Sequence, residues 1–107
     1  MITQEELLDL LKYDISTDEF GTITYWFNGE IHRDNDQPAI IYKNGTKLWY
    51  QHGNRHRDND LPAFIDSYGS EYWYQHGKIH RDNNQPAVIQ ENGTKSWWVD
   101  GKLIRSN

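Results

Sequence analysis

The sequence predicts a mainly β protein, in which tandem β-hairpin repeats form an elongated antiparallel single sheet behind a short N-terminal capping helix. The first observation is a tetrapeptide, His-Arg-Asp-Asn, that starts at His32, His56 and His80 and so recurs every 24 residues. The second is a pair of glycine series with the same spacing, which start at Gly21 and Gly29. Because no insertion interrupts this spacing, each unit is expected to occupy an equivalent structural position.

The chain therefore divides into two parts of unequal size. Residues 1–19 are expected to hold the helix and a linker, and residues 20–107 to hold three 24-residue β repeats plus a partial fourth. Thr3 and Glu6 have the spacing of a capping box, and the leucines that follow give the helix one broad apolar side. We expect Asp14–Glu19 to be a connecting loop. The partial repeat at the C-terminus should leave an unpaired edge strand, which another chain could extend.

Two kinds of turn are expected in each unit. Asn44-Gly45 and Asn92-Gly93 lie between β-rich segments and favour two-residue type I′ hairpin turns, which need positive φ at both positions. The second turn precedes each His-Arg-Asp box and holds His52 or His76 before its glycine. Histidine tolerates the left-handed region better than most residues do, so we interpret these two histidines as turn residues.

An aromatic segment lies between the two turns of every unit. Side chains alternate between the faces of a strand, so this segment predicts two aromatic columns on opposite faces of the sheet. One column holds Tyr25, Trp49, Trp73 and Trp97. The other holds Trp26, Tyr50, Tyr74 and Trp98. A single-layer sheet leaves one face at least partly wet, so an aromatic stripe there indicates an interaction surface. Cover by arginine and lysine stems, or burial in a dimer, is the alternative.

The composition bounds the function classes. Of the 107 residues, 36% are hydrophobic and 14% aromatic, so rings must supply much of the packing. The absence of cysteine excludes disulfides and thiolate metal sites and fits a cytoplasmic location. We expect no signal peptide, no membrane span and no cofactor. The net charge is −5 and seven of the sixteen acids lie in residues 1–30, so the near-neutral repeats do not favour a nucleic-acid partner.

The stretch Gly-Lys-Ile-His-Arg-Asp-Asn at 77–83, followed by Gln-Pro-Ala-Val-Ile at 85–89, resembles MORN-like repeats. The likeness covers residues 21–107. Such repeats recur in many phage, giant-virus and bacterial proteins. The resemblance implies successive β-hairpins laid edge to edge in one elongated, twisted sheet.

One position departs from the usual pattern of that family. The typical MORN unit has Gly after its His, whereas this chain has Arg33, Arg57 and Arg81 there, so we carry over the fold and not a lipid-binding role. The segment Glu5–Phe20 is similar to the opening of some phage homing-type endonucleases, without their nuclease core motif. Together the two resemblances imply a phage origin.

The repeated box is the candidate catalytic motif, because His and Asp two residues apart on a strand share a face. Its members are His32, Arg33, Asp34, His56, Arg57, Asp58, His80, Arg81 and Asp82. If each unit adds two strands, equivalent histidines lie about 9–10 Å apart at a strand spacing of about 4.8 Å, too far to share one metal ion. We therefore interpret the box as structural: His bonds the backbone of the neighbouring unit, Arg packs on an aromatic ring, and Asp-Asn caps the turn into Pro.

Specificity is expected where the units differ, because shared positions build the scaffold. Arg55 stands where the other units have Ile31, Ile79 and Leu103, and Tyr68 replaces a turn asparagine, so the central unit is the unusual one. The candidate binding residues are Trp49, Tyr50, Arg55, Arg57, Tyr68, Trp73, Tyr74 and Trp97. Drift at solvent-exposed positions is the alternative interpretation of these differences.

From these features we predict a non-enzymatic binding module that engages a protein partner through its aromatic face. For a phage protein, that partner would be a host protein such as a defence component. A homodimer through the C-terminal edge strand or the aromatic face is a further expectation. The alternatives are capture of a nucleotide-like ligand by aromatic rings and arginines, and a hydrolase or nuclease that uses a His-Arg-Asp box.

Overall fold

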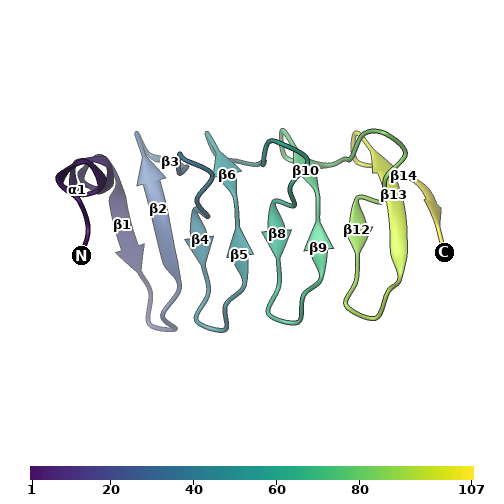
Figure 1. Ribbon diagram of the computed structural model, residues 1–107, viewed down its shortest axis with the longest axis horizontal. Helices are drawn as coiled ribbons and strands as arrows, with labels where there is room; N and C mark the ends of the chain where they lie inside the picture. The colour runs from purple at the N-terminus through teal and green to yellow at the C-terminus, as the bar shows by residue number, and fades with distance from the viewer.

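Figure 1 shows the computed structural model, which describes all residues 1–107. The chain forms an elongated, open antiparallel sheet with extents of 46 × 24 × 24 Å. The helix lies at one end of the long axis, and the hairpins follow one another in chain order to the C-terminus at the other end (Figure 1). The predicted fold class, mainly β with one short N-terminal helix, is confirmed.

The main sheet has ten strands in the order β1-β2-β4-β5-β8-β9-β12-β13-β14, with β3 paired to β2. The helix is α1 (Gln4–Leu11), and these strands are β1 (Asp14–Thr17), β2 (Ile23–Phe27), β3 (Glu30–Ile31), β4 (Ile40–Ile41), β5 (Lys47–Leu48), β8 (Phe64–Ile65), β9 (Glu71–Tyr72), β12 (Val88–Ile89), β13 (Lys95–Val99) and β14 (Lys102–Ser106). Two short hairpins lie outside this sheet: β6 (Tyr50–Gln51) with β7 (Asn54–Arg55), and β10 (Tyr74–Gln75) with β11 (Lys78–Ile79). A full 24-residue unit thus adds two strands to the main sheet and one short hairpin beside it.

The helix begins as its sequence predicts. The Thr3 hydroxyl accepts a hydrogen bond from the Glu6 backbone N–H at 3.0 Å, and the Glu6 carboxylate accepts one from the Thr3 N–H at 3.3 Å. This capping box satisfies two N–H groups that a helix start otherwise leaves free. No helix of the structure is long and apolar enough to span a membrane.

The segment after the helix corrects one expectation. Asp14–Thr17 is not a loop but the edge strand β1, which pairs antiparallel with β2 over four residues. The turn that joins them is tight, because the Asp18 carboxylate accepts backbone N–H groups from Phe20 and Thr22. The segment is short and polar, so its strand character comes from pairing with β2 and not from its own pattern. It completes the sheet on the helical side.

The Asn-Gly turns also differ from the prediction. Gly45 has φ +95°, but Asn44 does not have positive φ, so the turn is not type I′. Its backbone bonds run from Gly45 N to Tyr42 O and from Tyr42 N to Thr46 O, both at 2.9 Å. This is a three-residue loop with a single left-handed glycine. The Asn44 side chain accepts the Thr46 N–H at 2.9 Å, which explains why asparagine suits the position without a left-handed backbone.

The second set of turns agrees with the prediction. His52 and Gly53 have φ of 49° and 83°, and His76 and Gly77 have 52° and 84°, as a type I′ turn requires. The interpretation of these two histidines as turn residues is confirmed. A third set of left-handed pairs was not foreseen; it comprises Asn35-Asp36, Asn59-Asp60 and Asn83-Asn84.

The core of this single layer is thin and lies along the first aromatic column. Ala39, Ala63 and Ala87 are fully buried, and Trp49 and Trp73 keep only 6% of their surface exposed. The carbonyl oxygen of each alanine accepts a hydrogen bond from the backbone N–H of the preceding residue of that column, as in the 2.8 Å bond from Trp49 N to Ala63 O. Small residues at these positions let the large indoles fill the space between units.

Candidate binding surface

Each box histidine uses both ring nitrogens within the protein. His56 Nδ1 accepts the His76 backbone N–H at 3.1 Å, and its Nε2 lies 2.7 Å from Asp58 Oδ1. A backbone N–H can only donate, so the ring proton belongs on Nε2, which donates to the carboxylate. His32 and His80 have the same two contacts, with the N–H groups of His52 and Asp100. The predicted bond to the next unit's backbone is confirmed, and neither nitrogen is left to accept a proton from a substrate.

The role predicted for the box aspartates needs a correction. The carboxylates of Asp34, Asp58 and Asp82 accept from the histidine of their own box and do not cap the turn into Pro. That turn closes instead through the backbone, as in the bond from Gln37 N to Asp34 O at 3.3 Å. Because the next two residues are left-handed, the chain turns within three residues and leaves the aspartate side chain free to reach histidine.

Each box arginine stacks on a ring of the first aromatic column, as predicted. The guanidinium carbon lies 3.7 to 3.9 Å from the ring centre in the pairs Arg33–Tyr25, Arg57–Trp49 and Arg81–Trp73. Arg105, at the corresponding position of the partial fourth unit, lies 4.1 Å from the Trp97 ring centre in the same way. Such contacts are favourable because the ring face carries negative charge density. The guanidinium also covers that face of the ring, so a nucleotide base cannot stack there.

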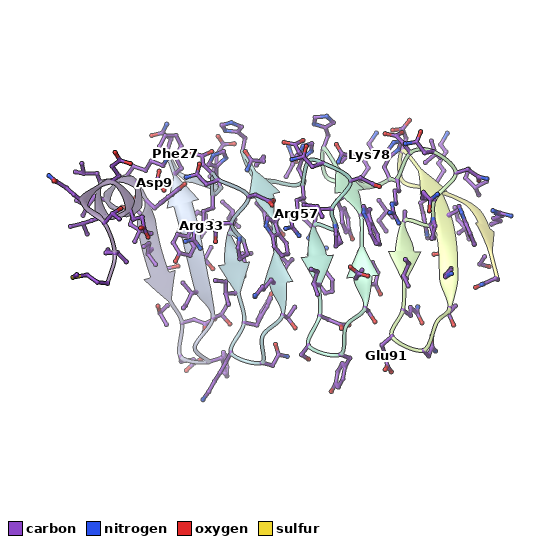
Figure 2. All side chains as sticks on the ribbon, in the orientation of Figure 1. Asp9, Phe27, Arg33, Arg57, Lys78 and Glu91 are labelled. Carbon is purple, nitrogen blue, oxygen red and sulfur yellow. The ribbon has the colours of Figure 1, made fainter.

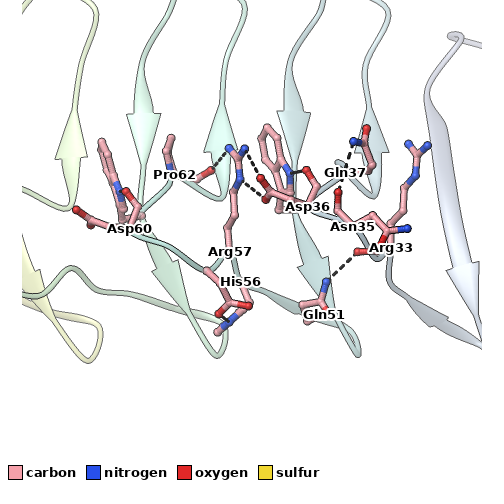
Figure 3. A network of polar contacts seen from close by, with 12 residues as sticks. Arg33, Asn35, Asp36, Gln37, Gln51, His56, Arg57, Asp60 and Pro62 are labelled. Atoms are coloured by element: carbon pink, nitrogen blue, oxygen red, sulfur yellow. Dashed lines mark hydrogen bonds and ion pairs between the residues drawn. The ribbon is translucent and has the colours of Figure 1, made fainter.

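The arginines carry a second contact that the sequence analysis missed. Arg57 Nε and Nη2 donate to the two carboxylate oxygens of Asp36 at 2.8 and 3.2 Å, and its Nη1 donates to Pro62 O at 3.0 Å (Figure 3). Arg81 makes the same fork contact with Asp60. This pairing lowers the pKa of the Asp60 carboxyl. The aspartate always precedes its arginine by 21 residues, a spacing that could have been found in the sequence.

These contacts frame two shallow hollows between successive units, with volumes of about 280 and 210 Å³. Trp49 and Asp36 line the first, and Trp73 and Asp60 line the second. The two hollows are copies of one another, 24 residues apart. Their polar groups are largely engaged with each other, so they build the joint between units. No group of three or more His, Asp or Glu side chains has an arrangement that could hold a metal ion.

The predicted binding residues fall into separate places. Trp49 and Trp73 are buried beneath arginines and offer no free face to a partner, so they leave the candidate surface. Trp97 is half-buried beneath Arg105. Tyr68 is 79% exposed, but it lies in the turn between β8 and β9, at the opposite end of the hairpins from β10 (Figure 1). Arg57 belongs to the joint described above.

Three of the predicted residues do come together. Arg55 Nε donates to the Tyr50 hydroxyl at 3.0 Å, and its Nη1 donates to the Tyr74 hydroxyl at 3.3 Å. The guanidinium carbon also lies 5.9 Å from the ring centre of Phe64. All four side chains are half-buried. We call Tyr50, Arg55, Phe64 and Tyr74 the Arg55 cluster.

The charge of the Arg55 cluster is not neutralised within the chain. Burial lowers the pKa of Arg55, but its bonds to the Tyr50 and Tyr74 hydroxyls raise it further, so the net shift is upward. No carboxylate lies within 4 Å of the guanidinium, and Nη2 donates to no protein group. A cation is therefore held in a fixed, partly dehydrated position among aromatic rings.

A comparison of the chain with protein-family models, curated proteins and solved structures finds no match. No relative therefore supplies a function for the Arg55 cluster. Its chemistry has to be inferred from its own contacts, which join one positive charge to three aromatic rings.

Proposed function

We propose that this protein is a non-enzymatic binding module that takes an acidic side chain of a protein partner on the Arg55 cluster. The observation that carries the proposal is the unpaired guanidinium of Arg55, half-buried between two tyrosine hydroxyls. Arg57 and Arg81, by contrast, each hold a carboxylate of their own chain. A partly desolvated arginine with free N–H groups gains most when it meets an oxyanion.

The position of Arg55 in the repeat supports a role in binding. Its sister units hold Ile31, Ile79 and Leu103 in the same place, opposite an aromatic residue of the paired strand. The fold therefore does not require an arginine there. Arginine and tyrosine, together with tryptophan, are also the side chains enriched among the residues that dominate protein interfaces.

The shape of the surface favours a protein over a small molecule. Four hollows occur on the molecule, and none of them is lined by a member of the Arg55 cluster. Small ligands are usually held in concave pockets, whereas protein interfaces are flatter. On the phage origin that the MORN-like and endonuclease-like resemblances together imply, the partner is a host protein, for example a component of host defence.

The test is selection from a displayed library of random peptides, with wild type and Arg55→Ile as baits. Isoleucine is the residue that two sister units carry, so this variant should fold. Wild type is expected to enrich peptides that place Asp or Glu beside apolar residues. Arg55→Ile should bind those peptides at least about tenfold more weakly, the order of one charged hydrogen bond.

The matched control is Lys47→Ile, which removes one positive charge from the same unit. Lys47 precedes Leu48, which pairs with Phe64, so it lies on the opposite face of the sheet. This control is expected to keep wild-type affinity. Equal capture of the same peptides by Arg55→Ile and wild type, or a selection without acidic residues, would overturn the proposal.

A further inference from the structure

The first box arginine, Arg33, differs from Arg57 and Arg81 in one respect. Arg33 stacks on Tyr25 and donates from Nη1 to Pro38 O at 3.2 Å, as the sister arginines do with their own rings and prolines. Its Nε and Nη2, which in Arg57 and Arg81 grip a carboxylate, donate to no protein group. The residue 21 positions before Arg33 is Lys12 and not aspartate.

Lys12 does not take the place of the missing carboxylate. Its Nζ is held by Asp9 Oδ1 at 2.8 Å and by Asp34 Oδ2 at 2.9 Å. These two carboxylates raise the pKa of Lys12. The lysine charge is therefore compensated by one carboxylate of the helix and one of the first box, and neither of them pairs with Arg33. The fork of Arg33 keeps a carboxylate-binding geometry without a carboxylate of the chain bound to it.

This fork borders the largest hollow of the molecule, of about 550 Å³, between α1 and the first unit. That volume lies in the range of small-molecule sites. Arg33, Asn35 and Gln37 line one side, where they are seen together in Figure 3. The helix supplies the other side with four residues: Glu5, Glu6, Asp9 and Leu10.

The two sides carry opposite charges. Glu5 has no hydrogen-bond or ion-pair partner, and Glu6 uses only one carboxylate oxygen, for the helix cap. A simple anion would be attracted by Arg33 but repelled by the helix. A molecule with a carboxylate at one end and an ammonium group at the other satisfies both sides.

We propose that the hollow between α1 and the first unit binds a zwitterionic small molecule of the amino-acid type. Its carboxylate lies on the Nε and Nη2 atoms of Arg33, as Asp36 lies on Arg57. Its ammonium group faces Glu5 and Glu6. Asn35 Nδ2 already donates to Asp9 at 3.4 Å and Gln37 Nε2 to the Asn35 backbone oxygen at 3.5 Å, so the side-chain amide oxygens of Asn35 and Gln37 are the acceptors that this wall leaves for the ligand.

The experiment is a titration of ¹⁵N-labelled protein, followed by amide chemical shifts, with a series of ω-amino acids of increasing chain length. For each length, the matching fatty acid and alkyl amine remove one charge. The result expected is saturable binding of at least one ω-amino acid, with shifts confined to α1 and residues 33–37. Its single-charge analogues should bind at least about tenfold more weakly, because each lacks one ion pair.

Three variants separate this site from general effects. Arg33→Lys keeps the charge but loses the two-pronged geometry, and Glu5→Gln loses the carboxylate that faces the ammonium group. Both variants should bind more weakly, while their amide spectra remain those of a folded protein. Glu91→Gln removes a carboxylate at the far end of a hairpin (Figure 2) and should not change binding. No saturable shift with any ω-amino acid, or unchanged affinity in Arg33→Lys, would overturn the proposal. Arg55→Ile should leave this binding intact, which keeps the two proposed sites distinguishable.

Discussion

Replacing Asn84 with Asp should stabilise the C-terminal unit by completing an arginine pair that the natural sequence leaves open. The guanidinium carbon of Arg105 lies 4.1 Å from the Trp97 ring centre, much as the box arginines stack on their own rings. Asn84, however, stands where the other units have Asp36 and Asp60. The backbone there is already correct: Asn84 has φ 55°, against 55° and 56° for those aspartates. A carboxylate at this position therefore falls in reach of both Nε and Nη2 of Arg105.

The size of the effect follows from exposure. Ion pairs on a protein surface contribute about 0.2–1 kcal/mol. Arg105 is exposed but already stacked on Trp97, so little side-chain freedom is lost on pairing. We expect about 0.5–1 kcal/mol. With an unfolding entropy of about 2.1 cal/mol/K per residue, this corresponds to a rise in Tm of about 2–4 °C for 107 residues.

Thermal unfolding followed by tryptophan fluorescence at low and high salt measures this rise, which should shrink as salt screens the pair. The matched control is Asn83→Asp, which makes the same charge change one residue earlier and should not stabilise. A gain in Asn84→Asp that is no larger than in Asn83→Asp would refute the reasoning. So would a gain that persists when Arg105 is replaced by Gln.

Two further predictions concern the histidine and aspartate contacts. His56→Phe keeps an aromatic ring but leaves the His76 backbone N–H without an acceptor, so it should lower the unfolding free energy by about 1–3 kcal/mol in urea titrations. The control is His76→Asn, which should change the unfolding free energy little because the His76 side chain is exposed. Equal stability of the two variants would contradict the hydrogen bond assigned to His56. Contact with Lys12 lowers the pKa of Asp34 in the folded protein, so the Asp34 carboxylate takes up a proton more readily in the unfolded chain than in the folded one. The unfolding free energy should be constant with respect to this group above a pH of about 4 and should fall as the pH drops below that value. The fall should be shallower in Asp34→Asn, and identical dependence of the unfolding free energy on pH in wild type and variant would contradict this prediction.

The fold class followed from the sequence because a constant spacing forces equivalent environments on equivalent residues. The left-handed turns at His52 and His76 followed from the tolerance of histidine for positive φ. The prediction of a type I′ turn at Asn44-Gly45 was wrong because that dipeptide suits both a two-residue and a three-residue loop. The hydrogen bond between Tyr42 and Thr46 decides between them. The strand β1 was missed because its own residues carry no strand pattern, and its strand character comes from pairing with β2, a different segment of the chain.

The candidate site was only partly predictable for a related reason. Comparing units singled out Arg55, since its sisters are aliphatic, and the structure brings it to Tyr50 and Tyr74. The burial of Trp49 and Trp73 depends on contacts between units, which a single strand pattern does not contain. The aspartate partners of Arg57 and Arg81 belong to the preceding unit, so a comparison of the residues within each His-Arg-Asp box does not reveal them.

These contacts suggest where function resides in a fold of this kind. Every buried side-chain N or O atom has a hydrogen-bond partner, and most contacts of one unit are repeated in the next. A charge that breaks the pattern is therefore the informative feature. Arg33, Arg55 and Arg105 all lack a carboxylate partner; Arg33 and Arg55 lie at the two proposed sites, whereas Arg105 would gain its partner in Asn84→Asp. Substitutions that restore the repeat separate stability from function. Arg55→Ile should preserve folding and lose binding, whereas Asn84→Asp should raise stability and leave binding at the Arg55 cluster unchanged.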